Sequence, residues 1–230
     1  MKYIILIPAY QPNHELIKLL TSINNEYPTI LVDDGSGKNY RDIFESAKKY
    51  AHVISYDNNM GKGYALKTGL NYIEDTYEDN YIVVTMDADG QHILKDALKL
   101  LEYVKEHPDS LAIGSRRWDK TTPIRSRIGN YITRKIFKLA THSSIYDTQS
   151  GLRAFSHQLN NYMLTNNGNR YDYEMNVLLN LNGHNIPFKE IPITTIYINN
   201  NRDSHFKTIK DSYKIYKVIY KWSKSKKKSN

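Results

Sequence analysis

Short apolar segments alternate with stretches of helical periodicity in the first half of the chain, and this alternation limits the possible folds more than any other feature. Five apolar segments lie at residues 3–7, 29–32, 52–56, 81–86 and 110–114. Between them, apolar side chains recur at the three- and four-residue spacing of a helix buried on one side. Strands that alternate with helices form βαβ units and a parallel sheet. We therefore predict an α/β fold with a mostly parallel sheet flanked by helices.

Polar residues follow four of these strands at the point where each strand ends. They are Pro8–Gln11, Asp33–Ser36, Asp87–Gln91 and residues 115–117. The carboxyl ends of parallel strands share one edge of the sheet, and ligands of open α/β sheets bind there. We expect a binding site at this edge.

Two carboxylates, Asp87 and Asp89, come directly after the buried strand at residues 81–86. In a turn that leaves a strand, such side chains can converge on one cation, and Mg²⁺ takes one or two carboxylates together with phosphate oxygens of a substrate. A simple turn is the alternative, because Asp and Gly also favour turns. Asp87-Ala88-Asp89-Gly90 is also similar to the nucleophile motif of haloacid-dehalogenase-type phosphatases, but that family carries the motif after its first strand.

Gly61-Lys62-Gly63 opens a predicted helix after the third strand. The free N–H groups at a helix N-terminus favour an anion, so this segment fits either a phosphate contact or an ordinary helix start. The pattern leaves both interpretations open.

Composition excludes several classes of protein. The 230 residues suit one domain, or one domain with an appendage. The absence of cysteine excludes disulfides and thiolate metal sites, as in many intracellular proteins. The apolar start is too short for a secretory signal, and no segment approaches the length of a membrane-spanning helix. Residues 200–230 carry ten Lys or Arg and two Asp, a balance of +8 that equals the whole chain's net charge. Residues 1–199 are thus neutral overall, which argues against a broad nucleic-acid surface.

Seven short motifs follow one another in an order that resembles the dolichyl-phosphate mannose synthase-like branch of the inverting GT-A glycosyltransferases, in glycosyltransferase family 2. The motifs are Pro8-Ala9-Tyr10, Val32-Asp33-Asp34-Gly35-Ser36, Asn59-x-Gly61-Lys62-Gly63-x-Ala65, Asp87-Ala88-Asp89-Gly90-Gln91, Gly114-Ser115-Arg116, Asp147-x-Gln149-Ser150-Gly151-Leu152-Arg153 and Tyr171-x-x-Glu174. The resemblance extends from about residue 3 to about residue 207, and implies a GT-A domain over residues 1–205 followed by a basic helix and tail over residues 206–230.

The resemblance implies a metal-dependent transfer of a sugar from a UDP- or GDP-sugar to an acceptor. By it, the base and ribose would be held by Pro8, Tyr10, Val32 and Asp34. The diphosphate would lie at Gly61, Lys62, Asp87, Ala88, Asp89 and Arg202, with Mg²⁺ or Mn²⁺ on Asp87, Asp89 and Gln91. The catalytic residues would be Asp89, Arg116 and Arg127, the two arginines facing an acceptor phosphate. Gln11-Pro12 and Gly90 depart from the family pattern, which leaves the donor base open.

The acceptor expected from the resemblance is a polyprenyl phosphate at the membrane, which already carries a negative charge and needs no strong base. A glycan or other hydroxyl acceptor is the alternative, with Asp172 or Glu174 as its general base. Both acids equally suit the first turn of a helix. A hypothesis of another class is a non-catalytic module that recruits partners to a membrane.

The C-terminal segment combines lysines and aromatic residues at helical spacing. The lysines are Lys207, Lys210, Lys214, Lys217, Lys221 and Lys224, and the neighbouring strip is Phe206, Ile209, Tyr213, Tyr216 and Tyr220. A lysine stripe beside aromatic rings is typical of a helix at an anionic membrane surface. We expect the strip up to Tyr216 to dock on the sheet domain and the later part to contact the membrane. The predicted location is cytoplasmic, peripheral on the inner face of the cell membrane.

Overall fold

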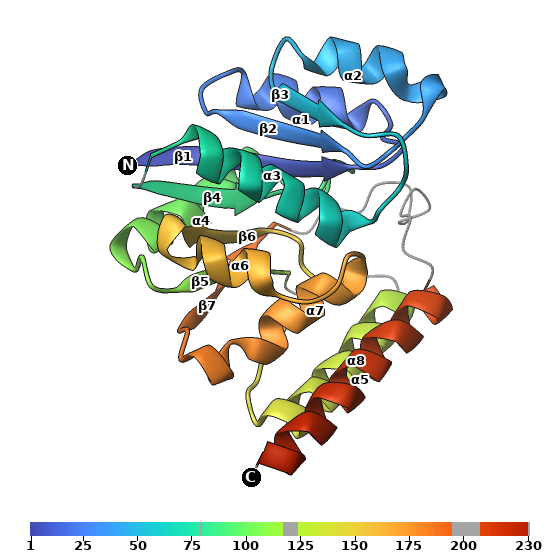
Figure 1. Ribbon diagram of the computed structural model, residues 1–230, viewed down its shortest axis with the longest axis vertical. Helices are drawn as coiled ribbons and strands as arrows, with labels where there is room; N and C mark the ends of the chain where they lie inside the picture. Colours follow the sequence, from blue (N-terminus) through green and yellow to red (C-terminus); the bar gives the residue numbers. More distant parts are fainter. Residues whose placement is uncertain (79, 117–123, 195–207, 230) are drawn as a thin grey trace.

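The computed structural model describes residues 1–78, 80–116, 124–194 and 208–229, with the backbone alone for 124–128, 208–213 and 226–229. One mixed sheet forms the centre, and helices cover both of its faces (Figure 1). Its strands are β1 (Lys2–Ala9), β2 (Thr29–Asp33), β3 (His52–Ser55), β4 (Tyr81–Thr85), β5 (Leu111–Arg116), β6 (Arg153–Ser156) and β7 (Phe188–Ile193). The helices are α1 (Glu15–Ile23), α2 (Arg41–Ala47), α3 (Lys62–Thr76), α4 (Leu94–Glu106), α5 (Ile124–Thr141), α6 (Asn160–Thr165), α7 (Tyr171–Asn180) and α8 (Thr208–Ser229).

The strand order is β3-β2-β1-β4-β6-β5-β7. Four neighbouring pairs are parallel, and β6 runs antiparallel between β4 and β5. The prediction of a mostly parallel α/β sheet is therefore confirmed. Strand β6 was not predicted, because it has only four residues, begins with the buried Arg153 and follows a polar loop.

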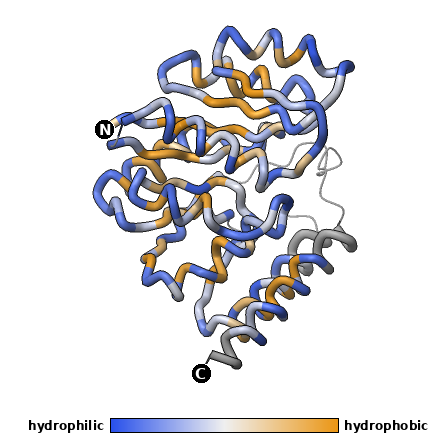
Figure 2. Tube along the Cα trace, in the orientation of Figure 1, coloured by the Kyte–Doolittle hydropathy of each residue, from blue (hydrophilic) through white to orange (hydrophobic). Residues whose placement is uncertain are grey.

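The two faces of the sheet carry separate hydrophobic cores, and β1 contributes to both. Ile4 and Leu6 face the core beneath α3, α5, α6, α7 and α8, whereas Ile5 and Ile7 face the core beneath α1, α2 and α4. This is the two-residue alternation of a strand buried on both sides. Figure 2 shows the result as apolar strands among helices in which apolar and polar residues alternate.

The register of the sheet brings the predicted strand ends to one edge. Pro8 on β1 lies opposite Val32 on β2, and the Asp34 N–H donates to the Ala9 carbonyl (2.8 Å). On the other side of β1 runs β4, whose end leads directly to Asp87.

The C-terminal helix α8 packs against α7 and α5. Ile215 and Ile219 are buried there, and Trp222 Nε1 donates to Asn180 Oδ1 on α7 (3.0 Å). These three residues were not assigned to the docked face from the sequence, and the half-buried Tyr216 and Val218 pack beside them. Phe206 lies outside the described residues, as do the side chains of Ile209 and Tyr213 and the expected domain boundary at 205/206. Within the described ranges, no helix has the length and apolar character needed to cross a membrane.

Candidate active site

Asp34 holds the loop between β3 and α3 against the end of β2. Its buried carboxylate accepts hydrogen bonds from the Tyr56 hydroxyl (2.7 Å), the Asn59 amide (3.0 Å) and the backbone N–H groups of Met60 (2.8 Å) and Gly61 (2.9 Å). The Gly61 N–H therefore points to a carboxylate of the protein itself. Burial, followed by the hydrogen bond to Asp34, raises the pKa of Tyr56 far above its ordinary value.

Lys62, at the start of α3, joins two carboxylates that come from distant parts of the chain. Its Nζ lies 2.6 Å from Asp87 Oδ1 and 2.9 Å from Glu174 Oε1 on α7. Burial alone would lower the pKa of Lys62, but the charges of Asp87 and Glu174 raise it well above its ordinary value. Burial likewise opposes ionisation of Asp87, yet the charge of Lys62, with a smaller contribution from Arg116, holds its pKa far below the usual range. Asp87 is thus fixed as an anion.

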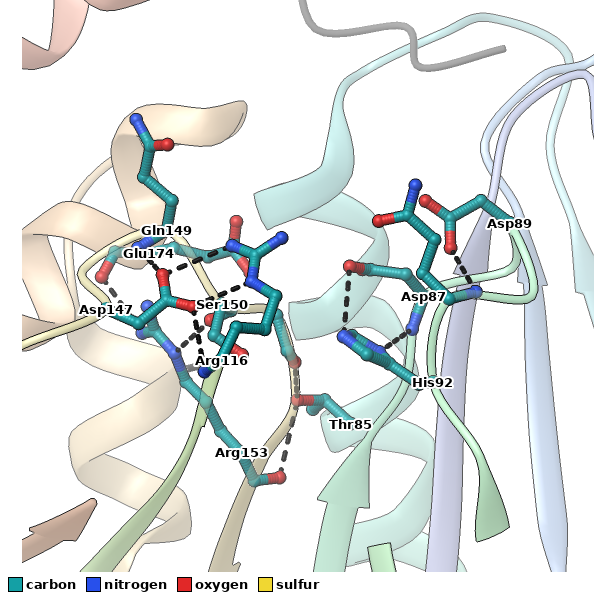
Figure 3. A network of polar contacts seen from close by, with 12 residues as sticks. Thr85, Asp87, Asp89, His92, Arg116, Asp147, Gln149, Ser150, Arg153 and Glu174 are labelled. Carbon is teal, nitrogen blue, oxygen red and sulfur yellow. Dashed lines mark hydrogen bonds and ion pairs between the residues drawn. The ribbon is translucent and has the colours of Figure 1, made fainter. Parts of the chain in front are cut away.

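His92 and Gly151 complete the surroundings of Asp87, and Figure 3 shows His92 beside this carboxylate. The Asp87 N–H donates to Nδ1 of the buried His92 (3.0 Å), so the ring proton lies on Nε2, 3.8 Å from Asp87 Oδ2. A Cβ on Gly151 would stand 2.7 Å from Lys62 Nζ and 2.6 Å from Asp87 Oδ1. Only a residue without a side chain fits beside this ion pair as it stands.

Asp89 has a different environment from Asp87. Its Oδ1 accepts the Gln91 N–H (3.0 Å), and no lysine or arginine of the described residues is ion-paired with it. Burial, and then the charge of Asp87, raise the pKa of Asp89. A cation placed beside Asp89 would reverse this shift, and carboxylate and amide oxygens are suitable ligands for Mg²⁺ or Mn²⁺. The donor set of Asp87, Asp89 and Gln91 thus fits the predicted metal.

Within the described ranges there is no cluster of three or more His, Cys, Asp and Glu residues suited to a metal ion. A magnesium site completed by substrate phosphates needs only one or two protein carboxylates. The small donor set is therefore compatible with a cation that arrives with a diphosphate.

Arg116, at the end of β5, is held by the fully buried Asp147. The contact is bidentate, with Nε 2.7 Å from Oδ2 and a terminal guanidinium nitrogen 3.1 Å from Oδ1. Asn130 of α5 donates to the same carboxylate (3.2 Å). Burial opposes the charge of Asp147, but Arg116 dominates and lowers its pKa. The pair fixes the Arg116 guanidinium near Asp87, and the charge of this guanidinium also lowers the pKa of Asp87.

A buried arginine supports the loop between the two ion pairs. Arg153 on β6 donates to the carbonyl oxygens of Ser150 (3.2 Å) and Glu174 (2.9 Å), and Thr85 donates to the Gly151 carbonyl (2.7 Å). These bonds connect β4, the 147–151 loop and the start of α7. They explain how Glu174 is brought to Lys62.

The structure brings the described candidate residues together in three adjoining groups. Pro8, Tyr10, Val32 and Asp34 lie at the ends of β1 and β2. Asp87, Ala88, Asp89 and Gln91 follow β4, and the ion pair of Asp87 with Lys62 joins them to Gly61 and Lys62 at the start of α3. Arg116 lies at the end of β5. The Arg127 side chain and Arg202 lie outside the described residues. Arg134 of α5 lies half-buried over the Tyr146 ring (4.9 Å).

Three contacts were not found from the sequence: the pairing of Lys62 with Glu174, the support of Arg116 by Asp147, and the close approach of Gly151. Asp147 and Gly151 appeared only as members of a short motif, and Glu174 appeared as a motif member and as a candidate general base. Asp172 lies in the first turn of α7, and its Oδ1 accepts the N–H of Arg170 just before the helix (3.0 Å). This agrees with the interpretation of Asp172 as an acid that suits the start of a helix.

Comparisons with known proteins identify the family of this chain. The model of the family described as glycosyl transferase family 2 matches residues 4–164. An uncharacterized protein of Methanocaldococcus jannaschii, MJ1222, is 34% identical over 200 residues, which span 84% of this chain and 81% of that protein. The UDP-N-acetylglucosamine–dolichyl-phosphate N-acetylglucosaminyltransferase of Methanococcus voltae is 29% identical over 84% of this chain and 85% of its own.

A solved structure shows the same fold. Glucosyl-3-phosphoglycerate synthase from Mycobacterium tuberculosis, crystallised with Mn²⁺, uridine diphosphate and glucosyl-3-phosphoglycerate, superimposes with a TM-score of 0.64. The match covers 97% of this chain and 80% of that one, at 17% identity.

Proposed function

Because this chain belongs to glycosyl transferase family 2, we propose that it transfers a sugar from a nucleoside-diphosphate sugar to a polyprenyl phosphate, with inversion at the transferred carbon. The relative from Methanococcus voltae, whose name gives a UDP-sugar donor and a dolichyl-phosphate acceptor, supports this choice of substrates. The proposed location is cytoplasmic, at the inner face of the cell membrane.

The observation that carries the proposal is the unequal pair of carboxylates beyond β4. Asp87 is held as an anion by Lys62, whereas Asp89 has a raised pKa and is paired with no lysine or arginine that the structure describes. We propose that Asp87, Asp89 and Gln91 hold Mg²⁺ or Mn²⁺. The bound cation would neutralise charge on the departing diphosphate.

The residues at the ends of β1 and β2 supply the proposed nucleoside site. Pro8 and Val32 are adjacent backbone positions, and Tyr10 and Asp34 follow them on the same edge. Asp34 fixes the loop that begins α3, so this edge is shaped before a ligand arrives. Pre-shaped sites lose less conformational freedom on binding.

A phosphate acceptor suits the described side chains better than a hydroxyl acceptor. A hydroxyl group needs a general base, and both candidates are engaged, Glu174 with Lys62 and Asp172 with the Arg170 N–H. Arg116, which Asp147 holds in place, supplies a positive charge that suits phosphate oxygens. We propose that Arg116 and Arg127 orient the acceptor phosphate and that Arg202 contacts the donor diphosphate.

The test is a panel of UDP- and GDP-sugars incubated with Mn²⁺ or Mg²⁺ and with either a polyprenyl phosphate or a soluble glycan. We expect one donor to be consumed only with metal and to label the lipid phosphate. Transfer to the glycan alone would replace the proposed acceptor. Nucleoside-diphosphate binding without turnover of any donor would contradict the enzyme and favour a binding module. The Asp89→Asn variant controls for contaminating activity.

A further inference from the structure

Helices α5 and α8 lie side by side on the outside of the domain and run in the same direction (Figure 1). Their mutual contact includes a hydrogen bond between Thr133 Oγ1 and the Tyr216 hydroxyl (3.4 Å). Phe137 of α5 and Ile219 of α8 are buried on the inner side of the pair. The pair therefore presents one continuous inner surface to the domain and one outer surface away from it.

The outer side of α5 exposes large apolar side chains. Leu139 is 78% exposed, Tyr131 57% and Ile132 42%. Helical geometry places residues seven or eight apart on the same side, so these three share one face with Lys135 and Lys138, which are also exposed. Together with Tyr220 of α8, they account for four of the seven large apolar residues exposed among the described residues. Such a concentration indicates an interaction surface.

The outer side of α8 adds an aromatic ring and further lysines. Tyr220 is exposed next to Lys217, Lys221 and Lys224, and the Lys224 ammonium lies 4.8 Å from the centre of its ring. Thr133 contacts Tyr216, and both helices run in the same direction. Along the helix axes, Tyr220 therefore lies between the positions of Ile132 and Leu139. The exposed apolar groups of the two helices thus lie at the same level, with ammonium groups on both helices.

We propose that this outer surface of α5 and α8 docks on an anionic lipid bilayer, with the apolar side chains of α5 inserted and the lysines at the lipid phosphates. Residues 129–142 and 214–225, whose side chains the structure describes, contain no Asp or Glu, so this part of the surface complements negative charge; the one acid of α8 is Asp211, near its start. Apolar tips surrounded by ammonium groups are typical of helices that lie in the membrane interface. Helix α5 is then the inserted element, in addition to the C-terminal lysines expected from the sequence.

The inference deepens the proposed function and rests on it for its biological purpose, since the inner side of α5 contacts the site. Asn130, next to the exposed Tyr131, donates to Asp147, which holds Arg116. A bilayer on the outer side of α5 would therefore lie one helix away from the guanidinium proposed for a lipid phosphate. Docking can be measured without donor or acceptor, so its failure is distinct from a failure of sugar transfer.

The first test compares flotation of the full chain with phosphatidylcholine vesicles with and without phosphatidylglycerol. We expect binding only to the anionic vesicles, weakening as salt rises. The double variant Ile132→Ser, Leu139→Ser should lower the partition coefficient about tenfold or more, because leucine-sized side chains lose their transfer to the apolar phase. Lys135→Gln with Lys138→Gln should lower the partition coefficient too. The charge-matched control, Lys49→Gln with Lys95→Gln, should not, because these exposed lysines lie just after α2 and on α4, at the other face of the sheet.

The second test uses the absence of cysteine from the chain. An environment-sensitive dye on Leu139→Cys should become brighter and blue-shifted with anionic vesicles, and the same dye on Lys49→Cys should not change. Binding with no response at position 139 would overturn insertion of α5 and leave the lysine tail as the contact. A dye response that increases with protein concentration in the absence of lipid would identify a second copy of the chain as the occupant of this surface, and would overturn the proposal. The absence of vesicle binding would overturn it as well.

Discussion

Gly151 lies so close to Asp87 that a Cβ atom on it would stand 2.6 Å from Oδ1 and 2.7 Å from Oδ2 of that carboxylate. Gly151→Ala must therefore displace Asp87 or Lys62, the ion pair that supports the proposed cation site. We expect kcat/KM for donor consumption to fall by about tenfold or more, equivalent to roughly 1.4 kcal/mol of transition-state stabilisation. Steady-state kinetics with saturating Mn²⁺ measures this.

A matched control is available on α5. A Cβ on Gly129 would meet no atom within 4 Å, so Gly129→Ala makes the same chemical change without a clash. We expect it to retain activity and to be slightly more stable, because Ala is the better helix former by about 1 kcal/mol. Equal activity of both variants would refute the steric argument at Gly151.

Glu174→Gln distinguishes a supporting acid from a general base. The substitution keeps the size of the side chain, and Lys62 retains its contact with Asp87. For a supporting role, we expect kcat to fall by no more than about tenfold with an unchanged pH profile, whereas loss of a general base costs about 10²- to 10⁴-fold. The measurement is kcat against pH with a lipid phosphate acceptor. A large loss together with a missing pH-dependent limb would restore the hydroxyl-acceptor alternative, and Asp172→Asn tests the second candidate in the same way.

Lys62→Met should change how stability depends on pH. In the native chain the pKa of Asp87 lies below its ordinary value of 3.8, so its contribution to stability is present above that pH and lost as pH falls through the folded pKa. Without Lys62, two partly buried carboxylates lose their shared cation, which we expect to cost about 2–3 kcal/mol at neutral pH. Burial of Asp87 would then favour its protonated form.

We therefore expect Lys62→Met to lower the free energy of unfolding most at neutral pH, and by less as the pH falls. Urea unfolding of both proteins from about pH 3 to pH 7 gives the two stability curves. Parallel curves would contradict the assigned ion pairs. Lys49→Met removes an exposed lysine as the control.

The alternation of apolar segments was sufficient to predict the fold, because strand and helix periodicity are local properties of a chain. Ile4 to Ile7 are buried alternately on two faces, as a strand between helix layers requires. Strand β6 was missed for the same reason, since its position is set by pairing with β4 and β5 rather than by its own four residues.

The candidate site was predicted where the relevant groups follow a strand directly, as Asp87 and Asp89 do. Its supporting contacts were not, because the partners of Lys62 and Arg116 approach from β4, α7 and the 147–151 loop through tertiary packing. A buried acid such as Asp147 gives no local signal in a sequence. Its role becomes visible only when the bidentate contact with Arg116 is seen.

Asp89→Asn should stabilise the metal-free protein while it removes the response to metal. The pKa of Asp89 is raised by burial and by Asp87, so its charge destabilises the folded state at neutral pH, and this cost disappears as pH falls. The amide oxygen can still accept the Gln91 N–H. We expect the Tm without metal to rise by a few degrees, which corresponds to about 1 kcal/mol for a domain of this size. Mn²⁺ with a nucleoside diphosphate should then raise the Tm of the variant less than that of the native chain. Differential scanning fluorimetry with and without EDTA measures both, and a lower metal-free Tm would contradict the assignment.

Asp34→Asn tests whether the nucleoside edge depends on the loop before α3. The carboxylate accepts from the Tyr56 hydroxyl and from the N–H groups of Met60 and Gly61, and an amide offers only one accepting oxygen for these donors. Hydrogen bonds to a charged group contribute about 1.5–3 kcal/mol each, so we expect a loss of roughly 2–3 kcal/mol in unfolding free energy. The exposed Asp57, in the same loop, provides the charge-matched control Asp57→Asn, which should be nearly neutral. Calorimetry with UDP and GDP then separates the two roles of Asp34. If the residue only holds the loop, affinity for both nucleotides should fall by a similar factor, whereas loss for one base alone would place the carboxylate in contact with that base.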